Sequence, residues 1–137
     1  AAISNAFTIK LELSSWHAHV AGQGDVRFKF GPYLGNSLNQ GYRLSYTAGD
    51  PLRLWRQGAR GAAVVKSSAK RFSFEDQKAH KLTWTRDAGG NMKVSVDGVA
   101  VIDVVDREFQ GAFAGLMMKN QGGDFIVKRV SVHDAPK

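Results

Sequence analysis

One stretch of the chain decides the fold class, and it reads Val94-Ser95-Val96-Asp97-Gly98-Val99-Ala100-Val101. An Asp-Gly pair between two alternating runs of β-forming residues is the strongest short-range hairpin signal that a sequence carries. The turn also fixes the register of the strands on either side. The stretch therefore predicts two antiparallel strands joined at Asp97-Gly98.

Short alternating runs bounded by glycine, proline or asparagine recur along the rest of the chain. A period of two places the apolar residues on one face of a strand. The expected strands lie at 7–13, 26–30, 42–46, 52–56, 62–66 and 71–74, then in a meander over 82–105, and finally at 113–119 and 125–132. Residues 74–78 fit a turn of helix or a loop. About ten short strands with little or no helix predict an all-β sandwich or barrel.

Size and composition suit a single globular domain. The chain has 137 residues, of which 43% are hydrophobic and 23% are charged, so residues 1–137 are expected to form one domain. Cysteine is absent, which excludes disulfides, thiolate metal sites and cysteine nucleophiles. The sequence contains no run of 18 apolar residues of the kind that could span a membrane as a helix. The chain begins at Ala1 and ends in Ala135-Pro136-Lys137, so we expect a mature form or, in our preferred interpretation, a module of a longer protein.

The positive charge is uneven along the sequence. The net charge is +7, and residues 53–81 carry eight lysines and arginines against two acidic residues, which gives +6 in this stretch alone. Such asymmetry suggests an anionic partner. The alternative is a solvated surface that keeps the protein soluble.

The aromatic residues suggest a sugar site, since sugars present apolar C–H faces beside hydroxyl groups. Trp55 fits best, because alternation places it opposite the core residues Leu52 and Leu54 and beside Arg53. The alternative is that Trp55 is buried beneath a loop. The other candidate ligand-binding residues lie in the loop before Val26, in the loop 32–40 and in the basic stretch, and they are Trp16, His17, Tyr33, Arg56 and Arg60.

Catalytic motifs are scarce. Glycoside hydrolysis needs two carboxylates in defined positions, and the only acidic cluster is Asp103, Asp106 and Glu108. The alternative role for Asp106 is to cap a turn. The sequence contains neither a serine-hydrolase elbow nor a dinucleotide fingerprint. Enzymatic activity is therefore less expected than binding, although a polysaccharide hydrolase or lyase stays open.

Metal and nucleic-acid sites are weakly indicated. His17 and His19 share one face if the segment is extended, but a zinc site needs three or four ligands, and His80 or His133 would have to join them. Calcium prefers six to eight oxygen ligands, and the candidates for it are Asp25, Asp103, Asp124 and Asp134. Basic charge with interleaved aromatics also suits nucleic acid, but no RNP, KH or cold-shock signature is present.

The pattern as a whole resembles the concanavalin A-like lectin/glucanase jelly roll, of the laminin G or carbohydrate-binding-module kind. The resemblance covers roughly residues 7–133. It is carried by the strings at 41–44 and 52–56, by His80-Lys81-Leu82-Thr83-Trp84, by Met92 to Gly98, by the corner 106–111 and by the closing strand 125–132.

This resemblance implies a two-sheet antiparallel β-sandwich (jelly roll) and a non-catalytic carbohydrate-binding module. Together with the basic stretch, it suggests an acidic polysaccharide as the ligand. The E-x-D-x-E run of the glucanases and the Arg/Glu and Gln-x-His motifs of the lyases are missing here. Some relatives bind calcium through loop carboxylates, whereas no other cofactor is expected. A structural or adhesive protein-interaction domain is the alternative function. We expect a secreted or cell-surface bacterial module, with a cytoplasmic location still open.

Overall fold

The computed structural model describes residues 3–15, 27–35, 37–74, 76, 78–122 and 125–134. These residues form ten strands: β1 (Phe7–Ser15), β2 (Arg27–Leu34), β3 (Ser37–Thr47), β4 (Pro51–Gly58), β5 (Gly61–Arg71), β6 (His80–Arg86), β7 (Asn91–Val96), β8 (Val99–Val105), β9 (Gly115–Gly122) and β10 (Phe125–Asp134).

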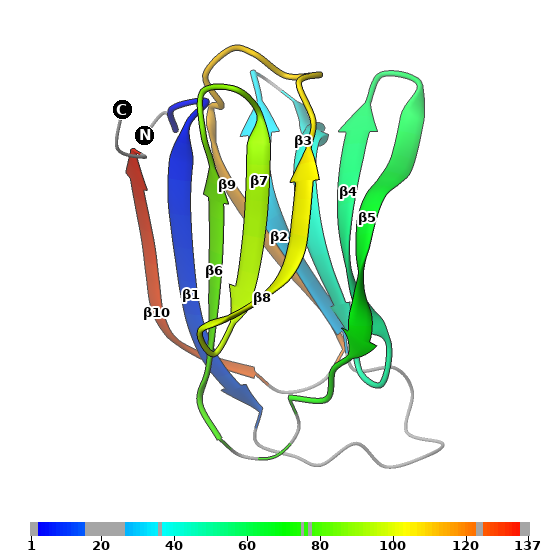
Figure 1. Cartoon of the computed structure of the whole chain (residues 1–137), viewed down its shortest axis with the longest axis vertical. Helices are drawn as coiled ribbons and strands as arrows, with labels where there is room; N and C mark the ends of the chain where they lie inside the picture. The colour runs from blue at the N-terminus through cyan, green and yellow to red at the C-terminus, as the bar shows by residue number, and fades with distance from the viewer. Residues whose placement is uncertain are drawn as a thin grey trace.

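The strands make two antiparallel sheets that pack face to face (Figure 1). One sheet has the order β10-β1-β6-β7-β8 and lies in front in Figure 1, and the other has the order β5-β4-β3-β2-β9. The predicted all-β sandwich is therefore confirmed. The described residues include no helix that could cross a membrane.

The hairpin forms as predicted. Asp97 has a φ of 50° and Gly98 a φ of 87°, and both are positive, as a tight turn matching the twist of the strands requires. Asp97 also ties the turn to β6. Its N–H donates to the carbonyl of Lys81 at 2.8 Å, and its carboxylate accepts the Lys81 N–H at 2.9 Å.

The core lies between the two sheets and follows the predicted alternation. The inward residues of β1 are all at most 1% exposed, and they are Phe7, Ile9, Leu11 and Leu13. Trp84 on β6 is fully buried. Its ring meets those of Phe7 and Phe30 edge to face at 5.6 and 5.8 Å, an arrangement that aromatic quadrupoles favour.

Several strand boundaries differ from the prediction, and β3 begins at Ser37, five residues before the expected start at 42. Gly31-Pro32 does not end a strand, because β2 continues to Leu34 and pairs with both β3 and β9. β5 contains the strand expected at 62–66 and continues to Arg71, whereas residues 72–74 of the strand expected at 71–74 are not in a strand. The polar run around Ser68 stays in the sheet because the Ser68 hydroxyl replaces a ladder partner, accepting the Leu52 N–H at 3.0 Å and donating to the Lys70 carbonyl at 2.6 Å.

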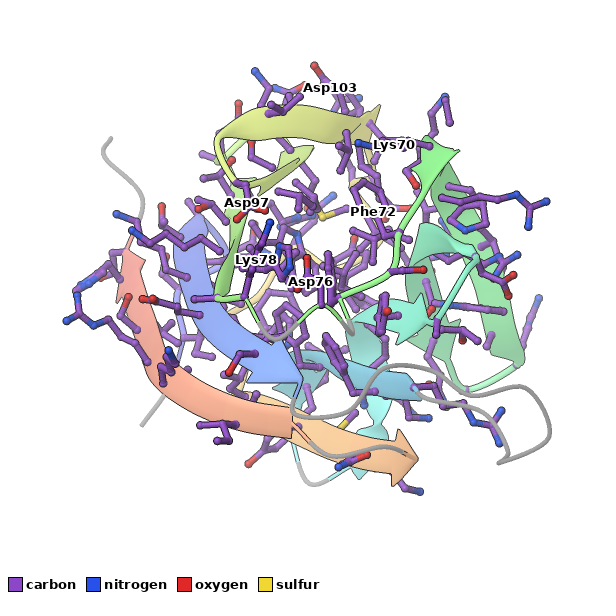
Figure 2. The ribbon with its side chains drawn as sticks, turned by 90° about the horizontal axis from the view of Figure 1, so that it is seen from below. Lys70, Phe72, Asp76, Lys78, Asp97 and Asp103 are labelled. Atoms are coloured by element: carbon purple, nitrogen blue, oxygen red, sulfur yellow. The ribbon has the colours of Figure 1, made fainter. Side chains whose placement is uncertain are left out.

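The crossover from β5 to β6 is irregular, and its described residues 72–74, 76, 78 and 79 are not helical. Phe74 is buried; its ring stacks on Tyr46 at 4.5 Å and lies 4.8 Å from the His80 ring. Two carboxylates hold that imidazole: Asp97 at 2.8 Å from Nδ1 and Asp76 at 2.9 Å from Nε2. Figure 2 looks at this end of the sandwich from below and labels both carboxylates. The cluster fastens the crossover to the β7–β8 turn.

Candidate functional site

The outer face of the sheet β5-β4-β3-β2-β9 carries the candidate site. On β4, Leu52 and Leu54 are fully buried in the core, so alternation turns Arg53 and Trp55 outward. Trp55 is partly exposed. With Arg53 and Ser45, it lines a hollow of about 340 Å³ on this face.

Trp55 is fixed within this hollow by one hydrogen bond. Its Nε1–H donates to the Ser45 hydroxyl at 2.8 Å, which draws the indole toward β3. Because Trp55 is partly exposed, part of its ring can offer an apolar surface. This combination of an apolar surface and adjacent hydroxyl and guanidinium groups suits a sugar ring.

The hollow is strongly basic. In the described part of the chain, the charged residues that line it are Arg27, Lys29, Arg43 and Arg53, and all of them are cationic. Lys29 also pairs across the strands with Lys119 on β9. Burial, reinforced by the charges of Lys119 and Arg43, lowers the pKa of Lys29. Lys119 and Arg43 are therefore close enough for their charges to act on Lys29.

Arg43 has a different environment from the other cations. It is only 2% exposed, and burial lowers the pKa of its guanidinium. Its Nη1 donates to the carbonyls of Tyr42 at 3.0 Å and Pro32 at 3.3 Å. Arg53, by contrast, is partly exposed and lies 3.6 Å from Asp50 at the surface, where an ion pair contributes little.

Arg56 and Arg60 do not join Trp55. Alternation places Arg56 on the inner side of β4, where its Nη1 meets the Asp106 carboxylate at 2.5 Å. Arg60 lies in the β4–β5 turn. Both line a second hollow of about 460 Å³, together with Glu108 and Phe109. The predicted set of basic residues is thus divided between two places.

The acidic cluster is not assembled as a pair of free carboxylates. Asp103 and Glu108 are exposed, whereas Asp106 is 7% exposed. Besides Arg56, the Asp106 carboxylate accepts the Tyr42 hydroxyl at 2.5 Å and the Glu108 N–H at 3.0 Å. Burial raises the pKa of Asp106, but these hydrogen bonds outweigh burial and hold the pKa below its ordinary value.

Tyr33 lies in β2 rather than in the loop predicted for it. It pairs with Gly41 on β3 and Gly115 on β9. By alternation it shares the outer face with Lys29. Gly41 in turn pairs with Gln57, which lines the hollow around Trp55. Tyr33 itself does not line that hollow, because its ring lies over Gly115 on β9, where an added Cβ would come within 2.8 Å of the Tyr33 hydroxyl.

Other predicted residues fall outside the described part of the chain, namely Trp16, His17, His19, Asp25 and Asp124. Among the residues that are described, no three His, Asp or Glu side chains gather in a way that could hold a metal ion. Asp103, His133 and Asp134 are exposed, on β8 and β10. Calcium binding therefore stays a prediction.

Sequence comparison with protein-family models and with curated proteins finds no match. Solved structures, however, share the architecture. A carbohydrate-binding module, CBM66, from Bacillus subtilis superposes with a TM-score of 0.74 at 19% identity, over 98% of this chain and 78% of that one. Sheep galectin-11, solved with glycerol, gives 0.69 at 12% identity, over 97% of this chain and 95% of that one. A variant of human galectin-16 gives 0.73 at 12% identity, over 98% and 92%. The chain therefore has the concanavalin A-like jelly-roll fold that its sequence resemblance predicted.

Proposed function

We propose that this domain binds carbohydrate on the outer face of the sheet β5-β4-β3-β2-β9. The observation that carries the proposal is the hollow around Trp55, where a partly exposed indole lies beside Ser45 and Arg53. The indole packs against the C–H face of a sugar, while the hydroxyl and guanidinium groups bond its oxygens. A structural neighbour that is itself a carbohydrate-binding module supports this proposal.

The charge of the hollow favours an acidic carbohydrate. A guanidinium binds a carboxylate or sulfate with two parallel hydrogen bonds, which the hydroxyl groups of a neutral sugar do not match. Arg27, Lys29 and Arg53 all line the hollow. We therefore propose an anionic polysaccharide as the ligand class.

The test is calorimetric titration of the wild type, Trp55→Ala and Arg53→Ala with a panel of neutral and anionic glycans. We expect Trp55→Ala to weaken binding of the best ligand at least tenfold, which corresponds to about 1.4 kcal/mol, and Trp55→Phe to restore part of it. Val99→Ala is the control, because Val99 is 66% exposed and lies at the turn of the other sheet. Wild-type affinity in both Trp55→Ala and Arg53→Ala would overturn the proposal.

One observation favours a protein-interaction function instead. Met118 on β9 and Val127 and Val130 on β10 are 40–44% exposed. They lie on the core side of two edge strands, because Met118 pairs with Phe30, Val127 with Leu13 and Val130 with Leu11. Concentration-dependent self-association in analytical ultracentrifugation, together with no binding to any glycan of the panel, would favour this alternative.

A further inference from the structure

Three of the cations on this face form a row with Ser45 that crosses the strands. Lys119 on β9 pairs with Lys29 on β2, Lys29 pairs with Ser45 on β3, and Ser45 pairs with Arg53 on β4. Paired residues in a sheet lie side by side and point to the same face. These four residues therefore form a continuous polar row across four neighbouring strands, whose order can be followed in Figure 1.

The spacing of the row follows from sheet geometry. Neighbouring strands lie about 4.8 Å apart, so the Cα atoms of Lys29 and Arg53 are about 10 Å apart and those of Lys119 and Arg53 about 14 Å apart. Ser45 separates Arg53 from the two lysines with a short hydroxyl. One sugar ring with one acidic group cannot neutralise both ends of such a row.

Trp55 leans toward this row. Its Cα is two residues from Arg53 along β4, yet its Nε1–H reaches Ser45 within the row at 2.8 Å. A sugar ring on the indole is thereby brought beside Arg53. A glycan that extends from this ring toward β9 would pass over Lys29 and then Lys119.

The charge of the row favours a ligand with more than one anionic group. Burial and the charges of Lys119 and Arg43 lower the pKa of Lys29, so Lys29 is repelled at close range by the lysine paired with it on β9. The acidic residue paired with Arg53 is Asp50 at 3.6 Å, at the end of the row that lies away from the lysines. An anion over β2 and β9 would relieve repulsion that Asp50 does not reach.

We propose that the ligand is a linear glycan with repeated acidic groups, lying across the strands from Trp55 on β4 to Lys119 on β9. This inference rests on the carbohydrate-binding function proposed above. It adds the direction in which the glycan lies on the sheet and the need for at least two acidic groups in the glycan. A glycan is favoured over single-stranded nucleic acid, because a nucleic-acid strand uses a series of aromatic side chains for successive bases. The row itself offers lysine, serine and arginine.

The test is a length series of oligogalacturonides, from the monosaccharide to the hexasaccharide, titrated into the wild type, Lys119→Gln and Lys10→Gln. The Lys10 control removes the same charge from the outer face of the other sheet, since Lys10 is exposed on β1. We expect wild-type affinity to rise with length and then level off. Lys119→Gln should weaken binding of the hexasaccharide about fivefold to tenfold and leave the monosaccharide unchanged. For Lys119→Gln with the hexasaccharide, the magnitude of the slope of log K against log salt concentration should fall by about one. Lys10→Gln should change neither the affinity nor this slope.

Three results would overturn the inference. The first is an equal loss for monosaccharide and hexasaccharide in Lys119→Gln, or no loss for either. The second is equal affinity for methyl-esterified oligogalacturonides, which keep the backbone but lose the charge; if Trp55→Ala still abolished that binding, the proposed function would stand while this inference failed. The third is tighter binding of an oligothymidylate of matched charge, which would assign the row to nucleic acid. Heparin fragments of matched length distinguish a preference for sulfate from one for carboxylate.

Discussion

Replacing Asp106 by asparagine tests whether this carboxylate holds the sandwich together or serves chemistry. Asp106 is fixed by Arg56 at 2.5 Å, by the Tyr42 hydroxyl at 2.5 Å and by the Glu108 N–H at 3.0 Å. Its backbone carbonyl also accepts Arg86 Nη2 at 2.7 Å. It therefore connects β3, β4 and β6 at one end of the molecule. Asparagine keeps the shape and one acceptor oxygen but removes the charge.

The size of the effect follows from burial. The Asp106 side chain is 5% exposed and that of Arg56 is 39% exposed. Breaking a buried ion pair costs roughly 3–5 kcal/mol, and the exposure of Arg56 reduces this to about 2–3 kcal/mol. Unfolding entropy is about 2.1 cal/mol/K per residue, so for 137 residues the Tm of Asp106→Asn should fall by about 7–10 °C.

Thermal unfolding followed by circular dichroism measures this change. The pKa of Asp106 is lowered in the fold, so its contribution is present above the ordinary carboxyl pKa and is lost as the pH falls through the folded value. The Tm difference from the wild type should be full at pH 7 and should shrink below about pH 4. Asp103→Asn is the control, since Asp103 is exposed on β8 and should cost less than about 0.5 kcal/mol.

A Tm for Asp106→Asn within about 2 °C of the wild type at pH 7 would refute this reasoning. A variant that keeps its Tm but loses product release from a polysaccharide would go further. It would favour the hydrolase alternative, in which Asp106 acts on substrate.

Two further perturbations test the turns and the crossover. Gly90→Ala should lower the Tm more than Gly98→Ala. Both glycines have a positive φ (85° and 87°), but a Cβ at Gly90 would lie 2.6 Å from the Asp106 carbonyl oxygen, whereas a Cβ at Gly98 would have nothing within 4 Å. Equal losses of Tm in thermal unfolding would contradict this steric explanation. Burial lowers the pKa of His80, but hydrogen bonds to the Asp97 and Asp76 carboxylates outweigh burial and raise it. The contribution of His80 is therefore present below its ordinary pKa and is lost as the pH rises through the folded value, so the Tm difference between wild type and His80→Asn should be larger at about pH 5.5 than at about pH 9; a constant difference would disprove it.

Local patterns were sufficient wherever one strand or turn decides its own structure. The Asp97-Gly98 hairpin needs only two residues that accept a positive φ, and both adopt it. The burial of Trp84 followed from the face it shares with Leu82, and both are at most 1% exposed. These features depend on contacts that the alternation itself specifies.

Local patterns failed where a partner from elsewhere changes the outcome. Pro32 looks like a strand end, yet β2 runs past it because β3 and β9 pair with the strand on both sides. The polar run around Ser68 looks like a break, yet its hydroxyl stands in for a backbone partner of Leu52. Neither partner can be identified from the neighbouring sequence.

The candidate site shows the same limit in its charge. A count along the chain concentrates the positive excess at 53–81, but of that stretch only Arg53 lies in the row beside Trp55, while Arg56 turns inward to Asp106. The other cations of the row are Lys29 and Lys119, 90 positions apart in the sequence and directly paired in the sheet. A strand alternates its faces at every residue, so a window of sequence mixes both faces of one strand and omits the adjacent strands altogether. Strand order is the missing information, and once it is known, the alternation that placed Trp55 outward also places the row.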